Sequence, residues 1–191
     1  GVGSPVLFLS GTGADLRVKP NVLDGPLAKS FRVIAYDQRG LGQTQKPLGP
    51  YEMEDYSKDA IALLDKLDIE NIHLVGVSFG GMVALHVALQ YPERITKVVL
   101  CCTSPGGDFA SFPFHDLPDD QTVTGRTMQL MEFNDLRHTR TWQKDNATRV
   151  DDMIKVMNSS LIKDHATPEF KRGCREQIQA RSRHDVVADL D

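Results

Sequence analysis

Four short apolar segments, separated by helical or turn-rich segments, limit most strongly the folds that this chain can adopt. They cover residues 5–9, 31–36, 72–77 and 97–102. Apolar runs of this length are typical of strands in buried parallel sheets. Residues 54–67 carry apolar side chains at helical spacing, and a second helix is expected from residue 79 to just before Pro92. Strands that alternate with helices predict a parallel sheet joined by right-handed crossovers.

The pattern changes after the fourth apolar segment. Residues 104–120 are rich in Pro, Gly and Asp, and residues 122–183 read as polar amphipathic helices with no strand between them. Thr167-Pro168 predicts a helix start, because proline is favoured at the first helical position. The expected fold class is α/β, a mostly parallel sheet with helices on both faces followed by an all-helical lid. The expected domains are a partial core over 1–107, a helical lid over 108–183 and the start of the return to the core over 184–191. A short helix is expected over 184–190.

Composition excludes several classes of function. The net charge is -4 without a basic stripe, which argues against a nucleic-acid partner, and no apolar run is long enough to span a membrane. Three cysteines do not make a disulfide framework, and no signal peptide is recognisable, so a cytoplasmic location is expected. Cys101 and Cys102 lie in an apolar run and are interpreted as buried small side chains.

A Gly-x-Ser-x-Gly sequence joins the third apolar segment to the helix after it. It consists of Gly76-Val77-Ser78-Phe79-Gly80. In a nucleophile elbow the serine sits on a sharp strand-to-helix turn, so its hydroxyl stands clear of the backbone. Glycines at 76 and 80 are expected because strand and helix approach closely there. Ser78 is the predicted nucleophile, and the alternative is a plain turn with an incidental serine.

A second glycine-containing loop, Gly11-Thr12-Gly13, follows the first apolar segment. In this architecture such a loop supplies one oxyanion donor, and the residue after the nucleophile supplies the other. The predicted donors are the backbone N–H groups of Thr12 and Phe79, although an ordinary loop is an alternative. Asp and His residues do not fall at metal-ligand spacing, so neither a metal nor a cofactor is expected.

Several motifs together resemble the α/β-hydrolase superfamily, in its branch of small esterases, enol-lactonases and C–C hydrolases. They are Asp37-x-Arg39-Gly40-x-Gly42-x-Thr44, the elbow within Val75–Met82, Tyr91-Pro92-Glu93-Arg94-Ile95, and Thr103–Gly107, which is similar to bacterial members related to 3-oxoadipate enol-lactonase. The resemblance extends from about Val6 to Gly107, and the helical second part fits the lid in position and length. It implies a serine hydrolase for a small ester, lactone or activated carbonyl, with a small-molecule substrate as its partner.

The chain also departs from the family pattern. Many relatives carry His-Gly where this chain has Ser10-Gly11. In the family an acid and then a histidine follow the lid, whereas this chain reaches only Asp191, so the resemblance implies the middle part of a longer enzyme. Asp108 is a weak candidate for the acid, because some relatives place the acid just after the fourth strand. His115 and His184 are weak candidates for the base, and for each the default interpretation is a solvated or structurally satisfied histidine.

Two other functions are compatible with parts of the sequence. A non-catalytic ligand-binding protein of the same fold fits a chain in which two triad members are not evident. Gly11-Thr12-Gly13 followed by Asp37 also imitates a dinucleotide-binding fingerprint, but Leu16 stands at the third glycine position and is too bulky for that motif. The dinucleotide hypothesis is therefore rejected, and the substrate and oligomeric state are not predicted.

Overall fold

The computed structural model describes residues 1–117, 122–159 and 162–190, which fall into two compact units. The first comprises Gly1–His115 together with Lys163–Asp191, and the second comprises Asp116–Ile162. The segment expected as a lid over 108–183 is therefore divided, since its last helix belongs to the first unit.

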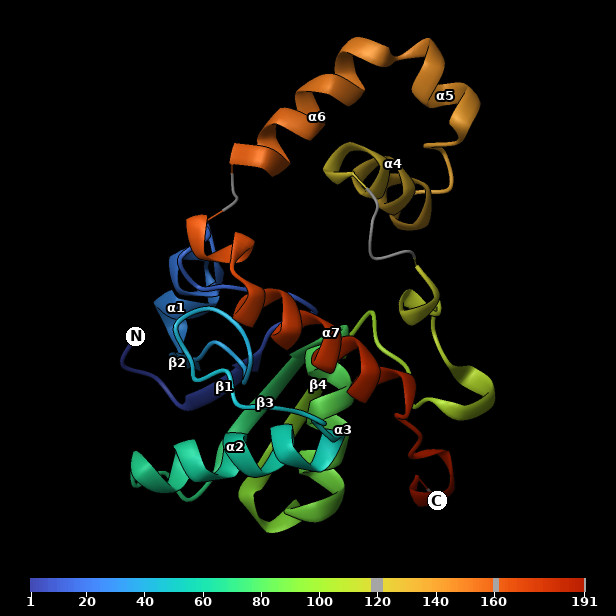
Figure 1. Ribbon diagram of the computed structural model, residues 1–191. Coiled ribbons are helices and arrows are strands. Elements are labelled where there is room, and N and C mark those ends of the chain that lie inside the picture. The colour runs from blue at the N-terminus through green and yellow to red at the C-terminus, as the bar shows by residue number, and fades with distance from the viewer. Residues whose placement is uncertain (118–121, 160–161, 191) are drawn as a thin grey trace. The chain divides into compact units, whose positions relative to one another are not determined.

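A four-stranded parallel sheet forms the centre of the first unit (Figure 1). Its strands are β1 (Pro5–Leu9), β2 (Arg32–Ala35), β3 (Ile72–Val77) and β4 (Ile95–Cys101), in the order β2-β1-β3-β4. β1 and β3 occupy the middle, and their buried side chains include Leu7 and Leu74, both with no exposed surface. The predicted strands and their parallel pairing are confirmed, and with them the fold class.

Two helices complete the core beside the sheet. α2 (Met53–Lys66) starts at a capping box between Glu52 and Asp55, and α3 (Phe79–Gln90) ends before Pro92, as predicted. Tyr56 and Leu64 of α2 pack with Phe79 of α3 in one buried cluster. The other helices of this unit are η1 (Val22–Asp24), α1 (Leu27–Ser30), η2 (Pro92–Arg94), η3 (Gly107–Phe109), η5 (Lys163–Ala166), α7 (Pro168–Ser182) and η6 (Val187–Asp189). η4 (Phe114–Asp116) spans the sequence boundary between the two units.

The described residues of the second unit form three α-helices joined by short turns. It contains α4 (Val123–Asn134), α5 (Arg140–Asp145) and α6 (Ala147–Ser159). Met131 and Val150 are buried within it. The buried Gln143 side chain donates hydrogen bonds of 3.0 Å to the carbonyl oxygens of Met128 and His138, which ties α5 to α4 and to the turn between them.

α7 starts where the sequence predicts. Thr167 caps the helix by accepting a hydrogen bond from the Phe170 N–H, and Pro168 is its first residue. Among the described residues after Ser182, only Val187–Asp189 is helical, as a single 3₁₀ turn, so the short helix expected over 184–190 is largely absent. No helix in the described ranges is both long and apolar enough to cross a membrane.

The prediction of two buried cysteines at 101 and 102 is wrong. Cys101 is half-buried, and Cys102 is exposed. Cys102 has a φ of 42°, a left-handed conformation in which the chain turns away at the end of β4. A run of apolar residues therefore did not predict burial at the edge strand.

Candidate active site

Ser78 lies at the junction of β3 and α3 in a strained conformation. Its φ of 52° and ψ of -119° are rare for a residue with a side chain, and such a conformation costs about 1–3 kcal/mol. The Ser78 N–H donates to the Cys101 carbonyl at 2.9 Å, and the Thr103 hydroxyl donates to the Ser78 carbonyl at 2.8 Å. The end of β4 thus holds the turn at Ser78 from two sides.

The glycines around Ser78 stand where backbone segments nearly touch. A Cβ on Gly76 would lie 2.4 Å from the Gly80 carbonyl oxygen, and a Cβ on Gly80 would lie 2.1 Å from the Leu9 carbonyl oxygen. Gly81 is equally confined, because its Cβ would lie 2.5 Å from the Thr103 side chain. No role was predicted for Gly81. Its position next to Gly80, at the start of the same helix, could have indicated the same close packing.

The loop after β1 lies against Ser78. A Cβ on Gly11 would be 3.4 Å from the Ser78 Cβ and 4.0 Å from its Oγ. Thr12 follows at the exposed tip of this loop. Phe79 is the first residue of α3, so its N–H has no acceptor within the helix and lies at the positive end of the helix dipole. The loop with Thr12 and the N-terminus of α3 with Phe79 therefore flank Ser78.

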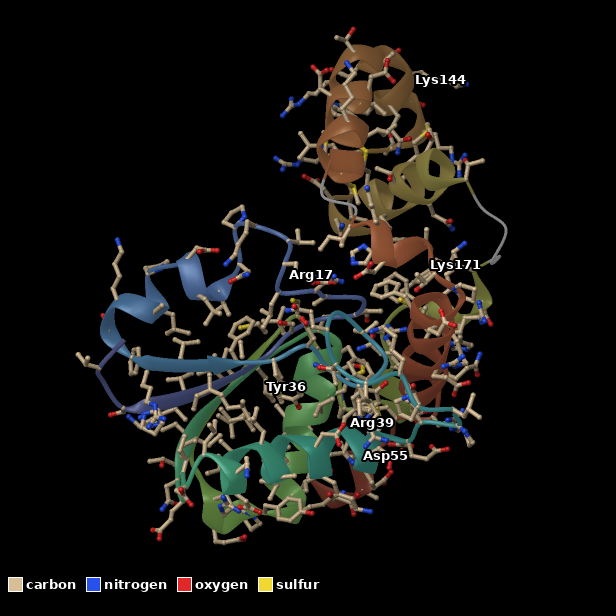
Figure 2. The ribbon with its side chains drawn as sticks, turned by 60° about the vertical axis from the view of Figure 1, so that its left-hand side comes forward. Arg17, Tyr36, Arg39, Asp55, Lys144 and Lys171 are labelled. Atoms are coloured by element: carbon tan, nitrogen blue, oxygen red, sulfur yellow. The ribbon has the colours of Figure 1, made fainter. Side chains whose placement is uncertain are left out.

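The aspartate and arginine of the D-x-R-G motif organise loops rather than face Ser78. Asp37 accepts hydrogen bonds from the N–H groups of Leu16 at 2.7 Å and Gln43 at 2.8 Å. Arg39 forms ion pairs with Asp59 at 2.7 Å and with Asp55 at 3.2 Å. Arg39 and Asp55 are labelled in Figure 2. Both oxygens of the Asp37 carboxylate therefore accept from N–H groups of the chain itself.

His184 is buried in a pair with His86. The His184 Nε2–H donates to the Ser104 carbonyl at 3.0 Å, which leaves the His184 Nδ1 to accept from the His86 Nε2–H at 3.1 Å. Burial lowers the pKa of both imidazoles, and the nearby His184 ring lowers that of His86 further. Both ring nitrogens of His184 are engaged in these contacts and neither is bonded to Ser78.

The other two weak candidates lie in the segment after β4. His115, on η4, and His184 line one cavity of about 220 Å³ together with Met82, Ser104 and Arg181, and Ser78 is not among the lining residues. Asp108 is exposed on η3. In the described part of the chain, no group of three or more His, Cys, Asp or Glu residues is arranged to hold a metal ion.

Two residues near the loop at 10–13 were not identified from the sequence. Gln38 follows β2, Gln177 lies on α7, and both are buried and hydrogen-bonded to this loop. Gln177 could have been noticed because it is a polar residue at helical spacing from Phe170, Gly173 and Ala180, which form the buried face of α7.

Comparison with known proteins identifies the family of the chain. The model of the alpha/beta hydrolase fold matches residues 4–151. The chain belongs to this family. Among curated members, it is 38% identical over 116 residues to a 2-hydroxymuconate semialdehyde hydrolase of a Pseudomonas species, and 40% identical over 74 residues to a 3-oxoadipate enol-lactonase of Acinetobacter baylyi. These matches cover 59% and 39% of this chain, but only 40% and 28% of the relatives.

Solved structures of the alpha/beta hydrolase fold superpose on nearly all of the chain. An enol-lactonase from Burkholderia xenovorans matches with a TM-score of 0.63 at 24% identity, covering 97% of this chain and 67% of its own. A meta-cleavage product hydrolase from Pseudomonas fluorescens matches with a TM-score of 0.71 at 22% identity, covering 97% of this chain and 66% of its own. At these identities the structures establish the fold alone.

Proposed function

We propose that the whole protein is a serine hydrolase that acts on a small ester, a lactone or another activated carbonyl. The observation that carries the proposal is the strained conformation of Ser78, which lies between β3 and α3 with Gly11 of the loop at 10–13 against it. An ordinary strand-to-helix turn would gain nothing from this conformation, whereas a nucleophile gains an exposed hydroxyl.

In the proposed reaction the Ser78 Oγ attacks the substrate's carbonyl carbon and gives its proton to a general base. The carbonyl oxygen becomes an oxyanion that accepts hydrogen bonds from the Thr12 and Phe79 N–H groups. Collapse of the tetrahedral intermediate expels the leaving group, and water then releases the acyl group from Ser78. His184 is unsuited to be the base because both of its ring nitrogens are engaged.

The relatives' names support this class of substrate. One curated relative is named a semialdehyde hydrolase and another an enol-lactonase, and both names describe small carbonyl compounds. The matched segments cover less than half of either relative, so the activity is proposed for the whole protein.

Labelling with a fluorophosphonate probe tests the proposal. The whole protein should become labelled, Ser78→Ala should lose the label, and Ser30→Ala, which changes an exposed serine at the end of α1, should keep it. A panel of aryl esters and small lactones then identifies the preferred bond. A folded protein whose Ser78 stays unlabelled would instead support the ligand-binding alternative.

A further inference from the structure

One face of α7 packs on the core and carries a single buried amide. Phe170, Gly173, Gln177 and Ala180 are buried at helical spacing, and Gln177 has no exposed surface. A buried amide without partners costs about 1–3 kcal/mol, so a glutamine on such a face indicates specific hydrogen bonds.

The partners of Gln177 form a chain of three hydrogen bonds around the loop at 10–13. The Gly13 N–H donates to the Gln177 Oε1 at 2.8 Å, and the Gln177 Nε2 donates to the Gln38 Oε1 at 3.1 Å. The Gln38 Nε2 then donates to the Ser10 carbonyl at 2.9 Å. The two glutamines thus hold both ends of the loop, with Gly11 and Thr12 between them.

The direction of each amide in this chain is determined by the backbone. Because the Gly13 N–H can only donate, the Gln177 Oε1 must face it and the Gln177 Nε2 must face Gln38. Because the Ser10 carbonyl can only accept, the Gln38 Nε2 must face it. An acidic side chain at either position would leave two acceptors facing each other.

Close backbone packing keeps α7 at this place. A Cβ on Gly173 would lie 2.0 Å from the Gly40 carbonyl oxygen, so helix and loop meet without intervening side chains. The Arg172 guanidinium donates to the Lys46 carbonyl at 2.8 Å in the same region. Gln177 therefore stands on a helix that cannot shift easily relative to the loop.

A second contact anchors the chain just beyond the loop. His165, on η5 before α7, is 2.9 Å from the buried Asp15 carboxylate, which also pairs with Arg17 at 2.7 Å. Burial by itself would raise the pKa of Asp15, but the hydrogen bonds from Arg17 and His165 hold this pKa well below its usual range. Residues 10–15 are thus fixed by α7 and by the segment before it.

We infer that Gln38 and Gln177 are positioning residues that hold the 10–13 loop so that the Thr12 N–H points at the oxyanion formed on Ser78. The inference rests on the proposed function. Loss of one oxyanion donor reduces kcat by about 10²–10³-fold, so a donor that is merely misdirected should reduce the rate by about 10–100-fold. The affinity of the protein for the probe before the reaction should change far less than the reaction rate.

The test measures the rate of fluorophosphonate labelling in the whole protein, because the phosphoryl oxygen of this probe occupies the oxyanion position. Gln177→Glu keeps size and shape but places a carboxylate against the Gln38 Oε1. We expect its maximal labelling rate to fall about 10–100-fold while the probe concentration for half-maximal rate changes little. Gln179→Glu, the same change at an exposed position of α7, should leave both values unchanged.

The pH dependence separates positioning from general damage. A buried carboxyl that faces an acceptor has a raised pKa, and its protonated form can donate to Gln38 again. The ratio of the Gln177→Glu rate to the wild-type rate should therefore rise from about pH 8 to about pH 6. Gln177→Met, which removes both hydrogen bonds, should lose rate without this recovery, and it also serves if Gln177→Glu does not fold.

Two labelling results would overturn the inference, and they can be distinguished. A wild-type protein that labels at Ser78 while folded Gln177→Glu and Gln177→Met label equally fast leaves the proposed function intact and removes the positioning role. A folded wild-type protein that does not label at all removes both. The hydrogen bond from the Gly13 N–H to Gln177 can be tested separately from labelling. Hydrogen exchange at the Gly13 amide should be slow in the wild type and fast in Gln177→Met, and equal exchange rates would contradict the inference.

Discussion

Gly80 lies where α3 packs closely against the end of β1, and a methyl group there has no room. Its Cβ would lie 2.1 Å from the Leu9 carbonyl oxygen, which is backbone and cannot rotate away. We expect Gly80→Ala to lower the free energy of unfolding by about 1–3 kcal/mol, because strand and helix must separate. Urea unfolding of the purified protein measures the change.

Gly25→Ala is the matched control for this prediction. Gly25 has a φ of -87°, which any residue adopts, and a Cβ there would make ordinary contact at 3.4 Å with the Val22 carbonyl oxygen. Gly25→Ala should change the free energy of unfolding by no more than about 0.5 kcal/mol. Equal stability of the Gly80 and Gly25 variants would contradict the crowding at the elbow.

At the residue scale, the sequence predicted what depends on near neighbours. Gly76, Ser78 and Gly80 are recognisable because their spacing, between a strand and a helix, is local. Gln38 and Gln177 could not be recognised in this way, since they are 139 positions apart and each looks like an ordinary polar residue. His184 looked like a possible base for the same reason, because its bond to His86 spans 98 positions.

At the scale of elements, α3 and the segment after α7 are joined by two neutral histidines. His86 and His184 have folded-state pKa values below that of an unfolded histidine, mainly because both are buried. The unfolded chain therefore binds more protons as the pH falls through about 6.5. The pair therefore contributes fully to the free energy of unfolding above that pH, and this contribution is lost as the pH falls below it.

We therefore expect the melting temperature to fall as the pH is lowered from about 7.5 to about 5.5, and to fall less steeply in His184→Gln. Calorimetry of both proteins at several pH values measures this difference. Parallel curves for wild type and His184→Gln would show that the pair does not titrate with folding.

Element types were predicted well where the pattern is periodic and the neighbours are known. The strand at 72–77 and the start of α7 at Pro168 agree with the expected residues. The role of α7 was less predictable, because a polar amphipathic helix shows that it has a buried face but not what covers that face. Its contact with the Gln38 and Gly40 loop became apparent only from the tertiary structure.

At the scale of the whole molecule, β4 leaves one edge of the sheet without a neighbour among the described residues. Val98, Val99 and Leu100 are 39%, 51% and 42% exposed. An apolar edge strand with free backbone groups pairs readily with another chain. We expect the 191-residue chain, produced by itself, to self-associate, and Val99→Lys to reduce this association.

Light scattering coupled to size-exclusion chromatography measures the association. Leu48→Lys, which changes an 81% exposed loop residue away from the edge strand, is the control and should not alter it. A monodisperse 191-residue chain that unfolds cooperatively would contradict the prediction.

The bond between Gly13 and Gln177 joins positions 164 residues apart, and this separation has a consequence for biosynthesis. Contacts of long sequence separation form late, after the intervening chain exists and its loop has closed. The contacts that hold Ser78 come from Gly11, Cys101 and Thr103 and are available much earlier in translation. A nascent chain can therefore complete the elbow while its 10–13 loop is still unsupported, and it acquires a fixed loop only once α7 has left the ribosome.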